Sequence, residues 1–136
     1  VDGAVSRNQG KGSISAICRS LDGVFLGASC MKYSGIAEPA TLEALACREA
    51  LALATDLHLE RILIASDCQT VVRDIQSRTG GSYATVIKEI NARAASFQQC
   101  SFIFERRDSN VEAHRLVKHA FGLDPGRHVW LLDPQT

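Results

Sequence analysis

A short, nearly continuous apolar segment at residues 61–66 constrains the fold more than any other feature of this chain. It reads Arg-Ile-Leu-Ile-Ala-Ser and lies between two stretches with helical spacing of apolar residues. A run of this kind is typical of a strand that is buried on both faces, as strands of parallel sheets are. The stretch before it follows Pro39, which suits the first turn of a helix. The segment therefore predicts an α/β fold with helices on a sheet.

Three extended segments are expected before that helix. Residues 12–19 alternate in part, with Ile14, Ala16 and Cys18 on one side, and residues 24–33 behave in the same way. The sequence Leu-Asp-Gly at 21–23 is a hairpin turn signal between them. A polar stretch at residues 6–10 ends in glycine and separates the first strand from the second. These patterns predict a three-stranded antiparallel meander.

The second half of the chain predicts three further helices and one more strand. A short helix around residues 71–75 ends at a pair of glycines (80–81), and a second helix follows over 86–97. Residues 101–105 form the fifth strand, and Asn110 is a good N-cap for the last helix. The order β-β-β-α-β-α-α-β-α indicates an α/β fold with one five-stranded mixed sheet flanked by helices. At 136 residues, we expect one domain over 1–136, with the tail that holds Trp130 packed over it.

Charge and cysteine content exclude several classes of protein. Fifteen basic and fifteen acidic residues give a formal net charge of zero, so any nucleic-acid site must be local. The five cysteines are scattered, without a C-x-x-C pair, which argues against a disulfide framework or a zinc site and favours a reducing compartment. No run reaches membrane length, and we expect no signal peptide. We therefore expect an intracellular protein of the cytoplasm or nucleus, without a membrane partner and monomeric.

Three acidic residues have a specific order and setting. Asp2 opens the first strand, Glu43 lies on the alanine-rich first helix, and Asp67 ends the apolar run. Asp2 alone would be an ordinary turn or cap residue and Glu43 a solvated helix residue, whereas Asp67 follows a strand end, where α/β proteins place ligands. Carboxylates in these three places can converge. Clustered oxygen ligands are what Mg²⁺ requires, and metal pairs held in this way catalyse phosphodiester cleavage. The trio predicts a shared divalent-metal site.

Four motifs in this order resemble ribonuclease H, and in particular its plant-type, reverse-transcriptase-like branch. They are Asp-Gly-Ala at 2–4, Glu-Ala-Leu-Ala at 43–46, Asp-Cys-Gln-Thr-Val at 67–71 and the closing segment 107–116; the tail at 126–130 is similar as well. The resemblance covers nearly the whole chain. It implies a ribonuclease H-like fold and a metal-dependent endoribonuclease that hydrolyses the RNA strand of RNA–DNA hybrids.

The resemblance also assigns roles to individual residues. It implies that Asp2, Glu43 and Asp67 are catalytic and hold Mg²⁺ or Mn²⁺ ions. A fourth catalytic position, acidic in many relatives, is occupied here by His114, as in several plant-type members. The polar residues implied to lie beside the hybrid or the site are Gln69, Asn110 and Asn8.

Departures from the family pattern keep a second hypothesis open. Besides His114, the catalytic histidine of some relatives is missing, Pro39 and Ala40 replace a polar pair, and no basic hybrid-binding protrusion is present. These changes favour a catalytically weak or inactive ribonuclease H-like module that binds nucleic acid or a protein partner. The three carboxylates favour the enzyme, because a scaffold has no physical need for them.

Two other metal-dependent classes are disfavoured. His114 and His119 are five residues apart on the last predicted helix, which turns them about 140° from each other, so they do not form a zinc pair. The related proofreading exonucleases carry Asp-x-Glu on the first strand, and here Ala4 stands in place of the glutamate.

Overall fold

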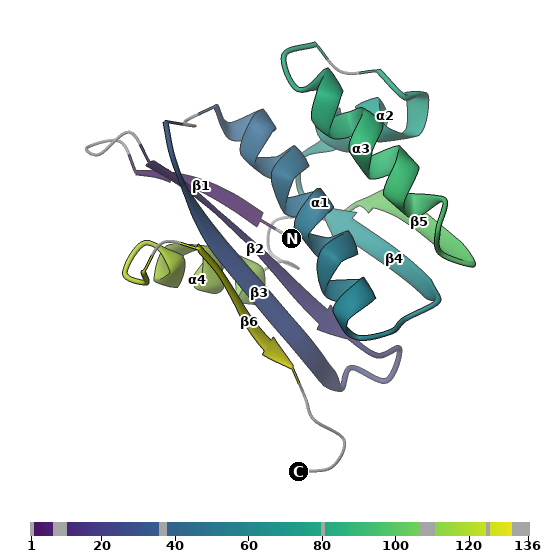
Figure 1. Cartoon of the computed structure of the whole chain (residues 1–136), viewed down its shortest axis with the longest axis horizontal. Helices are drawn as coiled ribbons and strands as arrows, with labels where there is room; N and C mark the ends of the chain where they lie inside the picture. The colour runs from purple at the N-terminus through teal and green to yellow at the C-terminus, as the bar shows by residue number, and fades with distance from the viewer. Residues whose placement is uncertain are drawn as a thin grey trace.

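The computed structural model describes residues 2–6, 11–35, 38–79, 81–106, 111–124 and 126–131; the side chains of 2–6 and 11 lie outside the described set. Its elements follow the predicted order, with one addition at the end (Figure 1). They are β1 (Asp2–Ser6), β2 (Lys11–Arg19), β3 (Phe25–Ser34), α1 (Pro39–Asp56), β4 (Arg61–Ser66), α2 (Gln69–Ser77), α3 (Ala84–Ala94), β5 (Gln99–Phe104), α4 (Val111–Ala120) and β6 (Gly126–Leu131).

The strands of the described residues form two sheets. The predicted meander is present as β1-β2-β3, and β6 adds to its far side, so that a four-stranded antiparallel sheet has the order β1-β2-β3-β6. The predicted buried strand β4 pairs in parallel with β5. The five predicted strands are thus all present. In the described residues they are divided between an antiparallel sheet and a parallel sheet instead of forming one continuous sheet.

β1 pairs with only part of β2. β1 runs from Asp2 opposite Ser15 to Ser6 opposite Lys11, so its described residues cover only the first half of β2. A small pocket of about 90 Å³ lies between the second half of β2, α1 and β4, and it is lined mostly by Ala, Leu and Ile.

Helix α1 is the central element of the core. Ala44, Cys47 and Leu51 pack with β4, β5, α2 and α3 in one apolar cluster, whereas Leu42 and Leu45 pack with Ile14 of β2 in a second. Of the residues predicted to share one side of β2, Ile14 and Ala16 are buried and Cys18 is half-buried, but Ser13 and Ser15 between them are buried as well. Because α1 is buried along two faces, it packs against both sheets. This packing fixes the position of Glu43 and of the other buried residues of the helix.

The opposite face of β2 binds α4 through two buried serines. The hydroxyl of Ser13 donates to the carbonyl of Val117 at 2.7 Å, and that of Ser15 donates to the carbonyl of Ala113 at 2.6 Å. Residues two apart on a strand face the same side, and residues four apart on a helix are one turn apart, so the two bonds match. Helices α1 and α4 therefore lie on opposite faces of the antiparallel sheet (Figure 1).

The C-terminal segment pairs with the sheet instead of only packing over the domain. β6 is antiparallel to β3, and Arg127 forms ion pairs with Glu49 and with Asp56 of α1, the latter at 2.7 Å. The backbone can approach here because β3 has Gly27, where an added Cβ would lie 3.1 Å from the carbonyl oxygen of Trp130. No helix in the described part of the chain is long and apolar enough to cross a membrane.

The helix predicted around residues 71–75 ends before the glycine pair at 80–81. α2 stops at Ser77, and Arg78 takes the left-handed conformation, with φ of 58°. The amide N–H of Thr79 then donates to the carbonyl of Asp74 at 2.9 Å, which closes the helix before Gly81 is reached. The helix end is set by this hydrogen bond and not by the conformational freedom of glycine.

Candidate active site

Two of the three predicted metal ligands, Glu43 and Asp67, lie next to Ser66, where β4 ends against α1. Glu43 lies in the first half of α1 and is only 6% exposed. Ser66, the last residue of β4, is 1% exposed, and its hydroxyl donates to Oε2 of Glu43 at 3.0 Å. Asp67 follows directly and is half-buried. The helix carboxylate and the strand-end carboxylate are thus held in one small region.

The turn that carries Asp67 is closed by the same serine. The amide N–H of Cys68 donates to the hydroxyl oxygen of Ser66 at 3.1 Å, a turn that serine hydroxyls form with the residue two positions on. Helix α2 begins one residue later, at Gln69. Asp67 therefore occupies the middle of a closed turn between a strand and a helix, at the carboxyl end of a parallel strand where α/β proteins place ligands.

The cysteines beside these carboxylates are suited to packing. Burial raises the pKa of the Cys68 thiol, and the negative charges of Glu43 and Asp67 raise it further. Burial also raises the pKa of Cys47, one turn from Glu43 on α1, to about 12. Both thiols stay protonated near neutral pH, and a neutral thiol is a poor nucleophile.

Asp2 and His114 are carried by β1 and α4, two elements that contact each other. β1 is the edge strand, it contacts both α1 and α4, and its Asp2 is paired in register with Ser15 of β2. Ser15 in turn binds the carbonyl of Ala113, the residue before His114 in the first half of α4. The strand of Asp2 is thus in contact with α1, which carries Glu43, and with α4, which carries the half-buried His114.

The predicted substrate-binding residues are only partly covered by the structure. Gln69 is exposed at the first position of α2, beside the Asp67 turn, where it is accessible to a ligand. Asn8 and Asn110 lie outside the described residues. His119 is exposed on α4, as expected for a residue that faces away from His114.

The donor chemistry of the region fits a hard divalent cation. Glu43 and Asp67 offer carboxylate oxygens, which Mg²⁺ and Mn²⁺ prefer, at a site where burial weakens competition from water. Among side chains that the structure describes, no group of three or more His, Cys, Asp or Glu is arranged to hold a metal. The side chain of Asp2 is outside that set, so the described pair is the part of the predicted trio that the structure brings together.

Sequence reasoning missed Ser66, although a signal for it exists. Ile62, Ile64 and Ser66 alternate along β4, and Ile64 and Ser66 are both buried toward the helices. A hydroxyl at the end of an otherwise apolar strand face must find a partner, because an unpaired buried polar group is costly. That partner is the carboxylate of Glu43 on α1.

Comparison with known proteins identifies the family. The sequence pattern of the reverse transcriptase-like family matches residues 1–120, which is most of the chain. The chain therefore belongs to the reverse transcriptase-like family. This confirms the resemblance that the four motifs indicate, while the plant-type branch stays a prediction. No curated protein matches the chain in sequence.

Solved structures with the same fold are ribonuclease H domains. The N-terminal RNase H domain of a Mycobacterium tuberculosis protein, fused to maltose-binding protein, has 22% identity and a TM-score of 0.79, with 89% of each chain covered. RNase H1 from the halophilic archaeon Halobacterium salinarum has 22% identity and a TM-score of 0.76 over 89% of this chain and 93% of that one. LC11-RNase H1, in complex with an RNA/DNA hybrid, has 18% identity and a TM-score of 0.78 over the same shares. The predicted ribonuclease H-like α/β fold is confirmed.

Proposed function

We propose that this protein is a divalent-metal-dependent endoribonuclease that hydrolyses the RNA strand of RNA–DNA hybrids. The observation that carries the proposal is the hydrogen bond from Ser66 to Glu43, which unites the buried helix carboxylate with the Asp67 turn. The family and the ribonuclease H-like fold support it. A chain with zero net charge has no general attraction to nucleic acid, so the affinity must come from this local site.

Each site residue has a definite task in this proposal. Asp2, Glu43 and Asp67 would hold the divalent ions, which supply activation of a water molecule and stabilisation of the leaving oxygen when bound. Ser66 orients Glu43, and the closed turn orients Asp67. Gln69, exposed at the start of α2, would contact the hybrid. Burial of Glu43 keeps its charge in a low-dielectric setting, where its interaction with a cation is strengthened.

Metal binding can be tested separately from cleavage. Converging carboxylates repel one another, and a cation that binds the folded state removes that repulsion. We expect Mn²⁺ at a 100-fold excess over its dissociation constant to stabilise the fold by about 2.7 kcal/mol through linkage, measured as a higher melting temperature. The same preparation should cut the RNA strand of a labelled hybrid and leave duplex DNA intact.

An unchanged melting temperature in millimolar Mn²⁺, with no perturbation of resonances near Glu43 and Asp67 by NMR, would contradict the metal site. The calcium ion is a useful comparison in the cleavage assay. It binds oxygen ligands with looser geometry than Mg²⁺. It should therefore stabilise the fold without supporting comparable cleavage.

A catalytically weak or inactive binding module is the second candidate, and the position of His114 favours it. An imidazole supplies no anionic oxygen, so a site that includes His114 suits Mg²⁺ less well than one with a fourth carboxylate, while the softer nitrogen suits Mn²⁺ somewhat better. Under this hypothesis the fold retains a surface for nucleic acid or a protein partner without efficient turnover. Turnover of a labelled hybrid distinguishes the two candidates: repeated cleavage favours the enzyme, and binding without cleavage in Mg²⁺ or Mn²⁺ favours the module.

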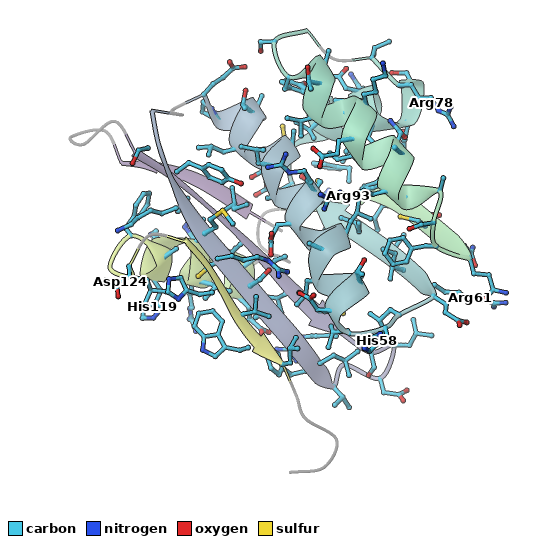
Figure 2. All side chains as sticks on the ribbon, in the orientation of Figure 1. His58, Arg61, Arg78, Arg93, His119 and Asp124 are labelled. Carbon is cyan, nitrogen blue, oxygen red and sulfur yellow. The ribbon has the colours of Figure 1, made fainter. Side chains whose placement is uncertain are left out.

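We expect His114→Asp to raise the Mg²⁺-supported cleavage rate by roughly tenfold, equivalent to about 1.4 kcal/mol of transition-state stabilisation. His114→Ala should cost less than loss of Asp2, Glu43 or Asp67. The matched control is His119→Asp, which adds the same charge to an exposed position of α4 (Figure 2). If both aspartate variants, or neither of them, change the rate and its Mg²⁺-to-Mn²⁺ ratio, His114 has no specific role.

A further inference from the structure

Ser66 is held from two sides, which leaves its hydroxyl in a defined place. Its backbone carbonyl accepts a hydrogen bond from the amide of Glu105, just after β5, at 2.9 Å. Its hydroxyl donates its proton to Oε2 of Glu43 and accepts the amide N–H of Cys68. The hydroxyl has one proton and two lone pairs, so the Cys68 contact directs that proton toward Glu43. One side chain thus couples the orientation of Glu43 to the shape of the Asp67 turn.

We propose that Ser66 is a positioning residue, which fixes the Glu43 carboxylate relative to Asp67 so that the two carboxylates are pre-arranged for a divalent cation. The inference rests on the proposed function, because it concerns the same metal site. Partners that hydrogen-bond to ligating carboxylates orient them, and their loss typically lowers metal affinity by 10- to 100-fold. Ser66 contacts both the Glu43 carboxylate and the backbone of the Asp67 turn.

Burial makes the role of this hydroxyl hard to replace. Ser66 is 1% exposed and Glu43 is 6% exposed. If the Ser66 hydroxyl is removed, a solvent molecule therefore has little access to replace its hydrogen bond to Glu43. The Glu43 carboxylate would lose a donor, and the amide of Cys68 would lose its acceptor at the same time. Both ligands would then sample more orientations before a cation arrives, and the ordering cost would be added to binding.

The experiment is a calorimetric Mn²⁺ titration of the purified chain, with paramagnetic broadening of NMR signals as a second readout that needs no substrate. We expect Ser66→Ala to weaken Mn²⁺ binding roughly 10- to 100-fold. Ser66→Thr keeps the hydroxyl and should bind Mn²⁺ close to the wild-type affinity. Ser13→Ala is the matched control, because it removes another buried serine hydroxyl that donates to α4 at 2.7 Å. It should lower the melting temperature without weakening Mn²⁺ binding.

The outcomes separate the positioning role of Ser66 from the metal site itself. If wild type binds Mn²⁺ and Ser66→Ala binds it equally well, the positioning role is wrong while the metal site stands. If wild type binds no Mn²⁺, the proposed function fails, and the inference with it. Should Ser66→Ala not fold, Ser66→Cys has a similar size and only a weak donor. Weakened binding by folded Ser66→Cys supports the role, and undiminished binding overturns it.

Discussion

Asp67→Asn is expected to reduce cleavage of an RNA–DNA hybrid by at least about a hundredfold while the protein stays folded. Asparagine has nearly the same shape as aspartate but no negative charge, and metal-assisted catalysis supplies several kcal/mol of charge stabilisation that depends on the bound ions. A loss of about 3 kcal/mol corresponds to roughly a hundredfold in rate. The measurement is single-turnover cleavage of labelled hybrid in Mg²⁺ and in Mn²⁺.

The fold should tolerate this change, because Asp67 is half-buried at a turn and the turn is closed by Ser66 and Cys68. Without metal, removal of one charge also relieves repulsion with Glu43, so the melting temperature should stay level or rise slightly. Asp124→Asn provides the control: it makes the same chemical change at an exposed residue after α4 (Figure 2). Equal cleavage by wild type and Asp67→Asn would identify the activity as a contaminant.

Leu51→Ala is expected to lower the free energy of unfolding by about 2–5 kcal/mol, the range for a fully buried leucine that leaves a cavity. Leu51 is 1% exposed and lies in the larger apolar cluster, where α1 meets β4, α2, α3 and β5. Because domains of this size are stable by only about 5–15 kcal/mol, the loss is a large share of the total. Urea denaturation followed by circular dichroism measures it.

The matched control is Leu63→Ala on β4, which makes the same truncation at a side chain that is 62% exposed. Little apolar area is removed from burial there, so the change in unfolding free energy should stay within about 0.5 kcal/mol, as for most surface substitutions. If the two variants lost equal stability, α1 would not be the central element of the core that its packing indicates.

Local patterns were sufficient for much of this fold. The hairpin signal at residues 21–23, the apolar run at 61–66 and the helical spacing after Pro39 each depend on neighbours in the chain, and all three elements are present. The motifs around Asp2, Glu43 and Asp67 predicted the ribonuclease H-like fold, which the family and the solved structures confirm. Such features are legible because their residues interact with residues close in sequence.

The contacts between residues far apart in the chain were not predicted from the sequence. The pairing of β6 with β3 depends on Gly27, which admits a second backbone, and on Arg127, which reaches Glu49 and Asp56 of α1. Nothing within the segment 126–131 signals these partners, because every one of them lies far away in the chain. The division of the strands into two sheets also depends on pairing between residues that lie far apart in the chain.

The candidate site divides along the same line. The sequence by itself determined which carboxylates are present and on which elements they lie, because residue identity and local periodicity are written in the chain. Only the tertiary structure decided that Glu43 is buried against Ser66, and that α4 approaches β2 closely enough for Ser15 to bind its backbone. The physical reason is that a hydrogen bond between two buried groups depends on packing over the whole core, which fixes both partners at once.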